Sequence, residues 1–135
     1  MSNRMQNQIL RVLLVATGLI FIFGIGALMR LWPAGFAWTP GQSEYELMFV
    51  AVYATLGVFL LLASREPGRH RSLILFAGWS SVVHGLVMAG QALVDASERT
   101  HMVGDVPALV LIGAALLFLA PRAVSAPVPE PVTRL

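Results

Sequence analysis

One helical stripe of polar and sulfur-containing side chains is the strongest candidate for chemistry in this sequence. His84 stands near the middle of an uncharged stretch, residues 72–94, and Met88, Gln91 and Asp95 follow it at intervals of four, seven and eleven residues. In an α-helix these intervals bring side chains onto one face. The stripe is therefore predicted to face the interior of the structure in which the helix packs.

Two interpretations of His84 are open. In the first, the imidazole hydrogen-bonds a neighbouring helix, with Tyr53, Thr55 and Thr17 as candidate partners, and so fixes the helix packing. In the second, it binds a haem iron, a copper ion together with Met88, a quinone headgroup or a proton in transit. The sequence does not identify the metal or the cofactor.

A second cluster of candidate residues lies in the segment 95–105, which contains three carboxylates, an arginine and a histidine. Asp105 stands just before Pro107, a pattern typical of a helix N-terminus, so helix capping is the structural interpretation. The functional alternative is that Asp95, His101 and Asp105 converge above the polar stripe. They would then surround a polar opening suited to a cation or to proton exchange.

Four long uncharged runs supply the helices that would carry these residues. They cover residues 12–29, 47–64, 72–94 and 106–121, and a bilayer core is spanned by about 20 apolar residues. The last run is the shortest, and a re-entrant segment is its alternative. With 57% hydrophobic and only 12% charged residues, the chain cannot cover a water-facing surface. The predicted fold is all-α, a four-transmembrane-helix bundle formed by residues 1–122.

The arginines predict the orientation of this bundle, since the chain has no lysine. Seven of the nine basic residues fall on one side of the predicted spans and two on the other. Basic residues concentrate in cytoplasmic loops, so both termini are expected in the cytoplasm. The seven are Arg4, Arg11, Arg65, Arg69, Arg71, Arg122 and Arg134, and the two are Arg30 and Arg99. Topology explains the net charge of +2, and no nucleic-acid partner is expected.

Two connecting segments have distinctive compositions. Residues 31–41 mix proline and glycine with two tryptophans, which predicts an interfacial aromatic loop or, alternatively, a lid over a cavity that opens outward. The tail, residues 123–135, has proline at every second position from 127 to 131. This spacing excludes a helix and favours an extended polyproline conformation, in a segment expected to lie in the cytoplasm.

Several kinds of chemistry are excluded or disfavoured. The chain has no cysteine, which excludes disulfides, cysteine-ligated clusters, thiol catalysis and covalent c-type haem attachment. A haem held by two histidines of one chain is disfavoured because His70 and His101 are predicted near opposite membrane surfaces. No catalytic set of residues is recognisable, so an enzymatic activity is not predicted.

Three stretches of the sequence carry a resemblance to known proteins. Tyr53–Leu61, Trp79–Met88 and Gly104–Leu109 resemble short four-span bacterial membrane proteins grouped as a domain of unknown function. The resemblance covers residues 46–122 and includes His84 among other residues. It implies the four-helix fold and a bacterial source, so that the bundle is expected in a bacterial inner membrane, and it implies no activity.

Three classes of function are compatible with these features. The first is a non-enzymatic accessory subunit that packs against a larger complex or self-associates through small-residue helix faces. The second is a membrane redox, quinone or metal- or haem-binding component centred on His84. The third, a small transporter, is disfavoured because residues 12–29 contain no carboxylate. The small residues that would allow close helix contact, within one chain or between copies, are Gly18, Gly24, Gly26, Gly78, Ser81 and Gly85.

Overall fold

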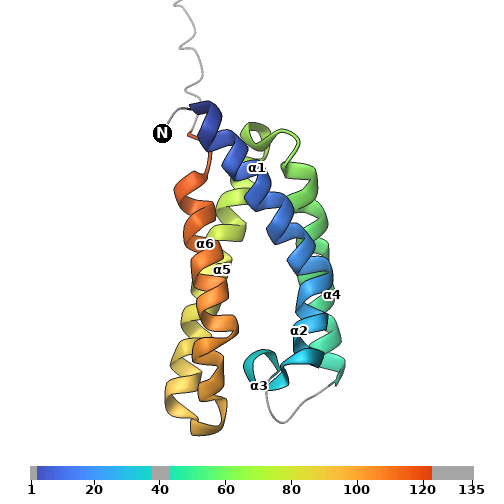
Figure 1. Cartoon of the computed structure of the whole chain (residues 1–135), viewed down its shortest axis with the longest axis vertical. Helices are drawn as coiled ribbons and strands as arrows, with labels where there is room; N and C mark the ends of the chain where they lie inside the picture. The colour runs from blue at the N-terminus through green and yellow to red at the C-terminus, as the bar shows by residue number, and fades with distance from the viewer. Residues whose placement is uncertain (1–2, 38–42, 123–135) are drawn as a thin grey trace, which may run out of the picture.

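Two antiparallel helical hairpins, lying side by side, make up the structure (Figure 1). The computed structural model describes residues 3–37 and 43–122, and every regular element in these ranges is a helix. The all-helical class predicted from the sequence is therefore confirmed. The first hairpin consists of α1 (Asn3–Leu19), η1 (Ile20–Gly24), α2 (Ile25–Leu31) and α4 (Ser43–Ala63), and the second of α5 (Arg71–Val94) and α6 (Asp105–Leu119).

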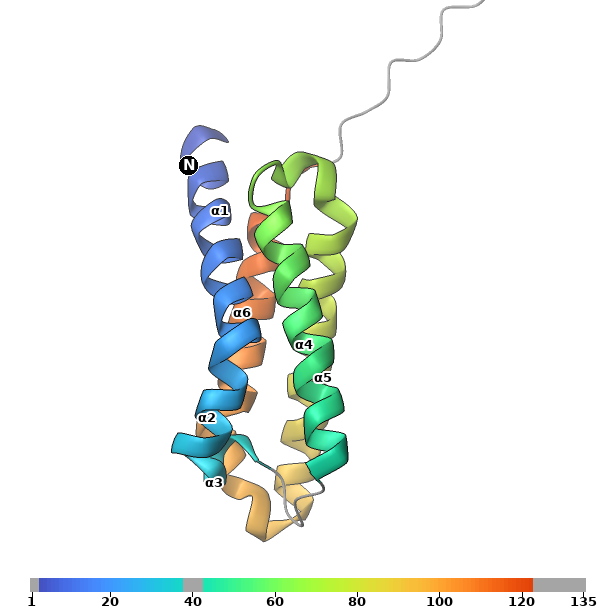
Figure 2. The ribbon, with the colours of Figure 1, turned by 90° about the vertical axis from the view of Figure 1, so that its right-hand side faces the viewer.

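Three short helices connect these elements. They are α3 (Pro33–Phe36), η2 (Pro67–His70) and η3 (Ala96–Val103). The start of α1, η2 and the end of α6 lie at one end of the molecule, and α3 and η3 lie at the other (Figure 2). We call these the η2 end and the η3 end. The predicted proline-rich tail, residues 123–135, lies outside the described residues, as does part of the tryptophan-containing connection.

Three continuous helical stretches are long and apolar enough to cross a membrane. They cover Arg4–Leu31 with 28 residues, Glu44–Ala63 with 20 and Pro67–Val94 with 28. The fourth candidate is a pair, η3 followed by α6, which meet at an angle of 41°. By itself α6 has 15 residues, fewer than the roughly 20 that span a bilayer core. The weakest of the four predicted spans is thus also the one that is bent.

The ends of the long helices follow from the local sequence. The first helix stops at Leu31, and Trp32 leaves the helical conformation, with ψ of 71°, because the following Pro33 disfavours a helical conformation before it. In the same way α6 stops at Leu119, two residues before the end of the predicted run. Ala120 has ψ of 139°, which the following Pro121 favours.

Within each hairpin, a pair of glycines brings the two helices into backbone contact. A Cβ atom built on Gly57 of α4 would lie 2.6 Å from the carbonyl oxygen of Gly18 in α1, and one on Gly18 would lie 2.8 Å from that of Gly57. In the second hairpin, a Cβ on Gly113 would lie 2.7 Å from the carbonyl oxygen of Gly78. No larger residue fits these positions without separating the helices. Both hairpins are therefore tightly packed units.

The contact between the hairpins is concentrated toward the η2 end. The main core cluster contains the start of α1, the end of α4, the start of α5 and the end of α6, with Leu14, Leu60, Ile74 and Leu116 completely buried. A smaller cluster of Met88, Val106 and Leu109 lies farther toward the η3 end. In Figure 1 the hairpins diverge in that direction.

The glycine contact in the first hairpin gives a testable prediction. Gly57→Ala should lower the free energy of unfolding in detergent micelles by about 1–3 kcal/mol, because the added methyl group meets backbone rather than a movable side chain. Gly26→Ala is the matched control, since a Cβ there has nothing within 4 Å. Equal stability of the two variants, measured by a denaturant titration, would contradict the close crossing.

Candidate functional site

A cavity of about 420 Å³ lies between the two hairpins. Its wall contains residues of η1, α2, α3, α4, α5 and α6, and nearly all of them are apolar. The aromatic members are Phe21, Phe36, Phe49 and Tyr53, and the charged member among the described residues of the wall is Asp105. The cavity has the size and lining of a site for a small lipophilic molecule.

The π-helical turn η1 forms part of this wall. Ile20, Phe21 and Gly24, three of its five residues, line the cavity. A π-turn inserts an extra residue into the helical repeat and occurs often at functional sites. Here it lies between the tight Gly18 crossing and α2, where the first hairpin begins to diverge from the second.

An aromatic cluster links His84 to the cavity. The ring of Tyr53 contacts Phe21 edge-on at a centroid distance of 4.8 Å and Phe49 at 4.6 Å. The imidazole of His84 packs against two rings of α4, Phe49 at a centroid distance of 5.4 Å and Tyr53 at 5.9 Å. His84 therefore lies beside two residues that line the cavity. It meets Tyr53, a candidate hydrogen-bond partner in the sequence analysis, through a contact between the two rings.

The structure separates the four residues of the predicted polar stripe. Met88 is buried and lines the cavity, whereas His84 is half-buried, and Gln91 and Asp95 are exposed. The reason is that the buried face of α5 is built on small residues, which pack closely against α6. That face consists of Ile74, Ala77, Gly78, Ser81, Gly85, Met88 and Ala92.

At the η3 end, a buried histidine lies between two carboxylates. His101 Nδ1 is 2.9 Å from Asp105 Oδ2, and His101 Nε2 is 3.1 Å from Glu98 Oε2. The exposed fractions are 0% for His101, 4% for Glu98 and 8% for Asp105. One imidazole thus bridges two buried acids, and Asp105 connects this ion cluster to the wall of the cavity.

Of the predicted outer cluster, the structure brings together His101 and Asp105 but not Asp95. Glu98 was not singled out in the sequence, although its spacing carries a signal. In a 3₁₀-helix residues i and i+3 lie one above the other, so η3 aligns Glu98 with His101. No helical repeat was predicted for residues 95–105, so the sequence did not pair Glu98 with His101.

Asp95 has a structural role at the surface. Its Oδ1 accepts hydrogen bonds from the backbone N–H of Ser97 at 2.9 Å and from the Ser97 hydroxyl at 2.7 Å, so it caps the start of η3. These bonds lower the pKa of Asp95. A carboxyl whose pKa is lowered by folding stabilises the fold above its unfolded pKa, and this contribution is lost as the pH falls through the folded value. The helix α6 begins at Asp105 itself, with Gly104 as the preceding cap residue.

The short helix α3 closes the η3 end of the cavity. A Cβ on Gly104 would overlap the backbone of Gly35, so α3 touches the corner between η3 and α6, next to Asp105. Phe36 of α3 lines the cavity and is supported by the Trp32 ring at 5.7 Å. These contacts make α3 part of the wall at the η3 end of the cavity.

The described residues contain no group of three or more histidine, aspartate or glutamate side chains arranged to hold a metal ion. In the ion cluster each ring nitrogen of His101 lies within ion-pair distance of one carboxylate, Nδ1 of Asp105 and Nε2 of Glu98. The contact between His101 and Asp105 ties η3 to α6.

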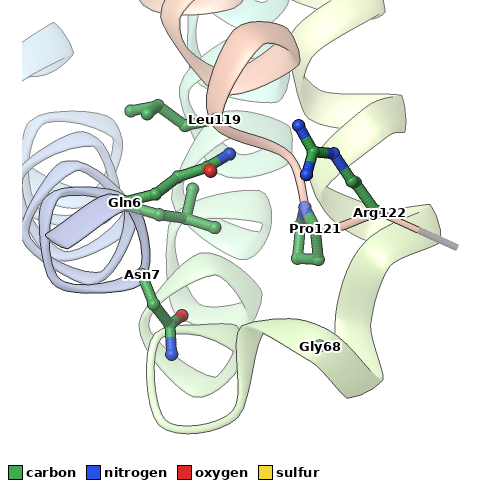
Figure 3. Close-up of a pocket in the computed structure, with 7 residues that line it drawn as sticks. Gln6, Asn7, Gly68, Leu119, Pro121 and Arg122 are labelled. Carbon is green, nitrogen blue, oxygen red and sulfur yellow. The ribbon is translucent and has the colours of Figure 1, made fainter. Parts of the chain in front are cut away.

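A second cavity, of about 300 Å³, lies at the η2 end. Gln6 extends from α1 toward the end of α6, where Pro121 and Arg122 lie, while Asn7 points away from it (Figure 3). Nearby, the Arg71 side chain donates a hydrogen bond of 2.8 Å to the Pro121 carbonyl oxygen and ties α5 to the end of α6. Its lining mixes polar and apolar residues and shares none of them with the apolar cavity.

Comparison with known proteins places the chain in a family. A family model described as a family of unknown function, DUF6632, matches residues 5–132. The chain belongs to this family. The match agrees with the resemblance seen in residues 46–122 and extends it over nearly the whole chain. No curated protein and no solved structure matches the chain.

The ion cluster gives a second prediction. His101→Ala removes the imidazole that Glu98 and Asp105 share, and breaking a buried ion pair from one side costs about 3–5 kcal/mol. The free energy of unfolding in detergent micelles should therefore fall by about this amount. Adding Glu98→Gln to His101→Ala should restore part of the loss, because one buried charge fewer remains uncompensated. His70→Ala, at an exposed position, is the control, and a His101→Ala variant as stable as this control would contradict the buried cluster.

Proposed function

We propose that this protein is a non-enzymatic accessory component of the bacterial inner membrane that binds a small lipophilic molecule between its two hairpins. The observation that carries the proposal is the 420 Å³ cavity. Among the described residues, its wall combines apolar and aromatic side chains with one charged side chain, and this composition is common in small-molecule sites. The tight hairpins on either side make it a preformed site.

The proposed topology has four spans with both termini in the cytoplasm. It is supported by the distribution of arginines, because those at the η2 end outnumber those at the η3 end. Arg4, Arg11, Arg65, Arg69, Arg71 and Arg122 belong to α1, η2 and the neighbouring helix ends, whereas Arg30 and Arg99 belong to α2 and η3. The positive-inside rule then assigns the η2 end to the cytoplasm and the η3 end to the outside.

A quinone headgroup is the second candidate for the occupant. One observation favours it: His84 packs on Tyr53 and Phe49, two aromatic residues of the cavity wall. A redox role would need the headgroup to lie against this aromatic cluster.

The accessory role implies contact with a partner subunit or a second copy of the chain. Several of the small residues seen in the sequence are used inside the chain, because Gly18, Gly78 and Gly85 pack against neighbouring helices. Gly26 and Gly90 have open space beside them. We propose that a partner helix approaches at these two positions, where close helix contact is possible.

The topology is tested by single-cysteine labelling, since the native chain has no cysteine. Gly68→Cys in η2 and Val103→Cys in η3 both lie at exposed positions. A membrane-impermeant maleimide should label Val103→Cys in intact spheroplasts and label Gly68→Cys only after the membrane is permeabilised. Labelling of both variants in intact spheroplasts would contradict the four-span topology.

The cavity is tested by filling it. Ala108 lies in the cavity wall, whereas Ala114, on the same helix, is exposed on the outer surface of the bundle. Protein in lipid nanodiscs should bind the neutral fluorescent probe 2-neopentylnaphthalene above the background of empty discs. Ala108→Trp should reduce this specific binding at least tenfold, and Ala114→Trp should leave it unchanged. Equal binding by both variants would show that the probe occupies lipid and not the cavity.

A further inference from the structure

Asp105 is the charged side chain through which the cavity can recognise a ligand. It belongs to the cavity wall, and 11% of its side-chain surface remains exposed. Tyr53 is the other polar residue in the described part of the wall. A carboxylate in apolar surroundings interacts strongly with a nearby charge, because little water screens it.

Among the described residues, one imidazole lies within ion-pair distance of both Asp105 and Glu98. An imidazole can carry at most one positive charge, whereas two carboxylates can carry two negative ones. Neither Arg30 nor Arg99, the arginines at this end of the molecule, forms an ion pair with Asp105, and both are exposed.

The aromatic side chains of the wall provide a second source of attraction for a cation. Phe21, Phe36, Phe49 and Tyr53 all line the cavity, and the edge-on and tilted contacts of Tyr53 hold two of these rings in place. The face of an aromatic ring attracts a cation within about 6 Å of its centre, by about 2 kcal/mol or more when water is excluded. Aromatic rings also bind neutral apolar molecules, so rings alone do not select an organic cation. Rings combined with a carboxylate do select one.

We propose that the cavity binds a lipophilic organic cation, an ammonium or phosphonium group carried on an apolar or aromatic body, with the Asp105 carboxylate as its counter-charge. This inference rests on the proposed binding function and specifies the ligand class. His101 holds the Asp105 carboxylate in position through Nδ1, and Glu98 holds the imidazole from the other side. Both are positioning residues, whereas Asp105 contacts the ligand.

The experiment compares two probes of the same shape and different charge. (2-Naphthylmethyl)trimethylammonium and 2-neopentylnaphthalene differ in one central atom, which is a cationic nitrogen in the first and a carbon in the second. Binding of each probe is measured by naphthalene fluorescence in nanodiscs of neutral lipid. Specific binding is the difference between the binding by the wild-type protein and the binding by the Ala108→Trp variant. The quantity of interest is the ratio of the two affinities.

The wild-type protein should bind the cationic probe at least tenfold more tightly than the neutral one. Asp105→Asn should reduce this ratio at least tenfold, and Asp95→Asn, which removes an exposed carboxylate outside the cavity, should leave it unchanged. Circular dichroism and gel filtration establish that Asp105→Asn is folded. If it is not, Glu98→Gln provides the second variant and should lower the ratio, since the imidazole then pairs with Asp105 alone and no carboxylate charge is left in excess; an unchanged ratio would overturn the inference.

Three other outcomes are informative. Equal affinities for the two probes in the wild type would overturn the inference and mean that a proton neutralises the cluster, while the proposed binding function would stand. A ratio that does not respond to Asp105→Asn would overturn the role of this residue. Absence of specific binding for both probes would overturn the proposed function itself.

Discussion

Backbone contact between helices at glycine pairs is the constraint on which the rest of the structure depends. Gly18 with Gly57 and Gly78 with Gly113 let two helices approach until each backbone limits the other. In a bilayer, where apolar side chains gain little by leaving lipid, such close packing is a main source of helix association. The consequence is an asymmetry: each hairpin is tight, and the interface between the hairpins is filled at the η2 end and open toward the η3 end.

At the η3 end, polar residues close the open part of the interface between the two hairpins. There η3 changes the helical repeat, which aligns Glu98 with His101, and the chain then turns at Gly104 into α6 so that Asp105 meets the same imidazole. The contact of Gly35 with Gly104 brings α3 over this corner. A buried ion cluster of this kind adds little net stability but fixes one arrangement. In this protein it fixes the position of Asp105, the charged residue in the described part of the cavity wall.

Local rules were enough to predict the helices. The uncharged runs anticipated all four long elements, and Pro33 and Pro121 account for where two of them stop. The candidate site was harder to predict from the sequence, because it depends on which face of each helix is buried. In α5 that face follows the small residues Gly78, Ser81 and Gly85, so the stripe beginning at His84 divides between cavity and surface. The position of Glu98 depends on a 3₁₀ repeat. The position of α3 depends on a contact between residues about 70 positions apart, Gly35 and Gly104.

A high-resolution experimental structure of the protein in lipid nanodiscs, without added ligand, would test the central claim most directly. The account predicts that the hairpins remain separated toward the η3 end and that density of one small molecule fills the space among Phe21, Phe49 and Leu109, reaching Asp105. The contrary result would be a closed interface, with Phe21 and Phe49 packed directly on Leu109 and no room for a ligand.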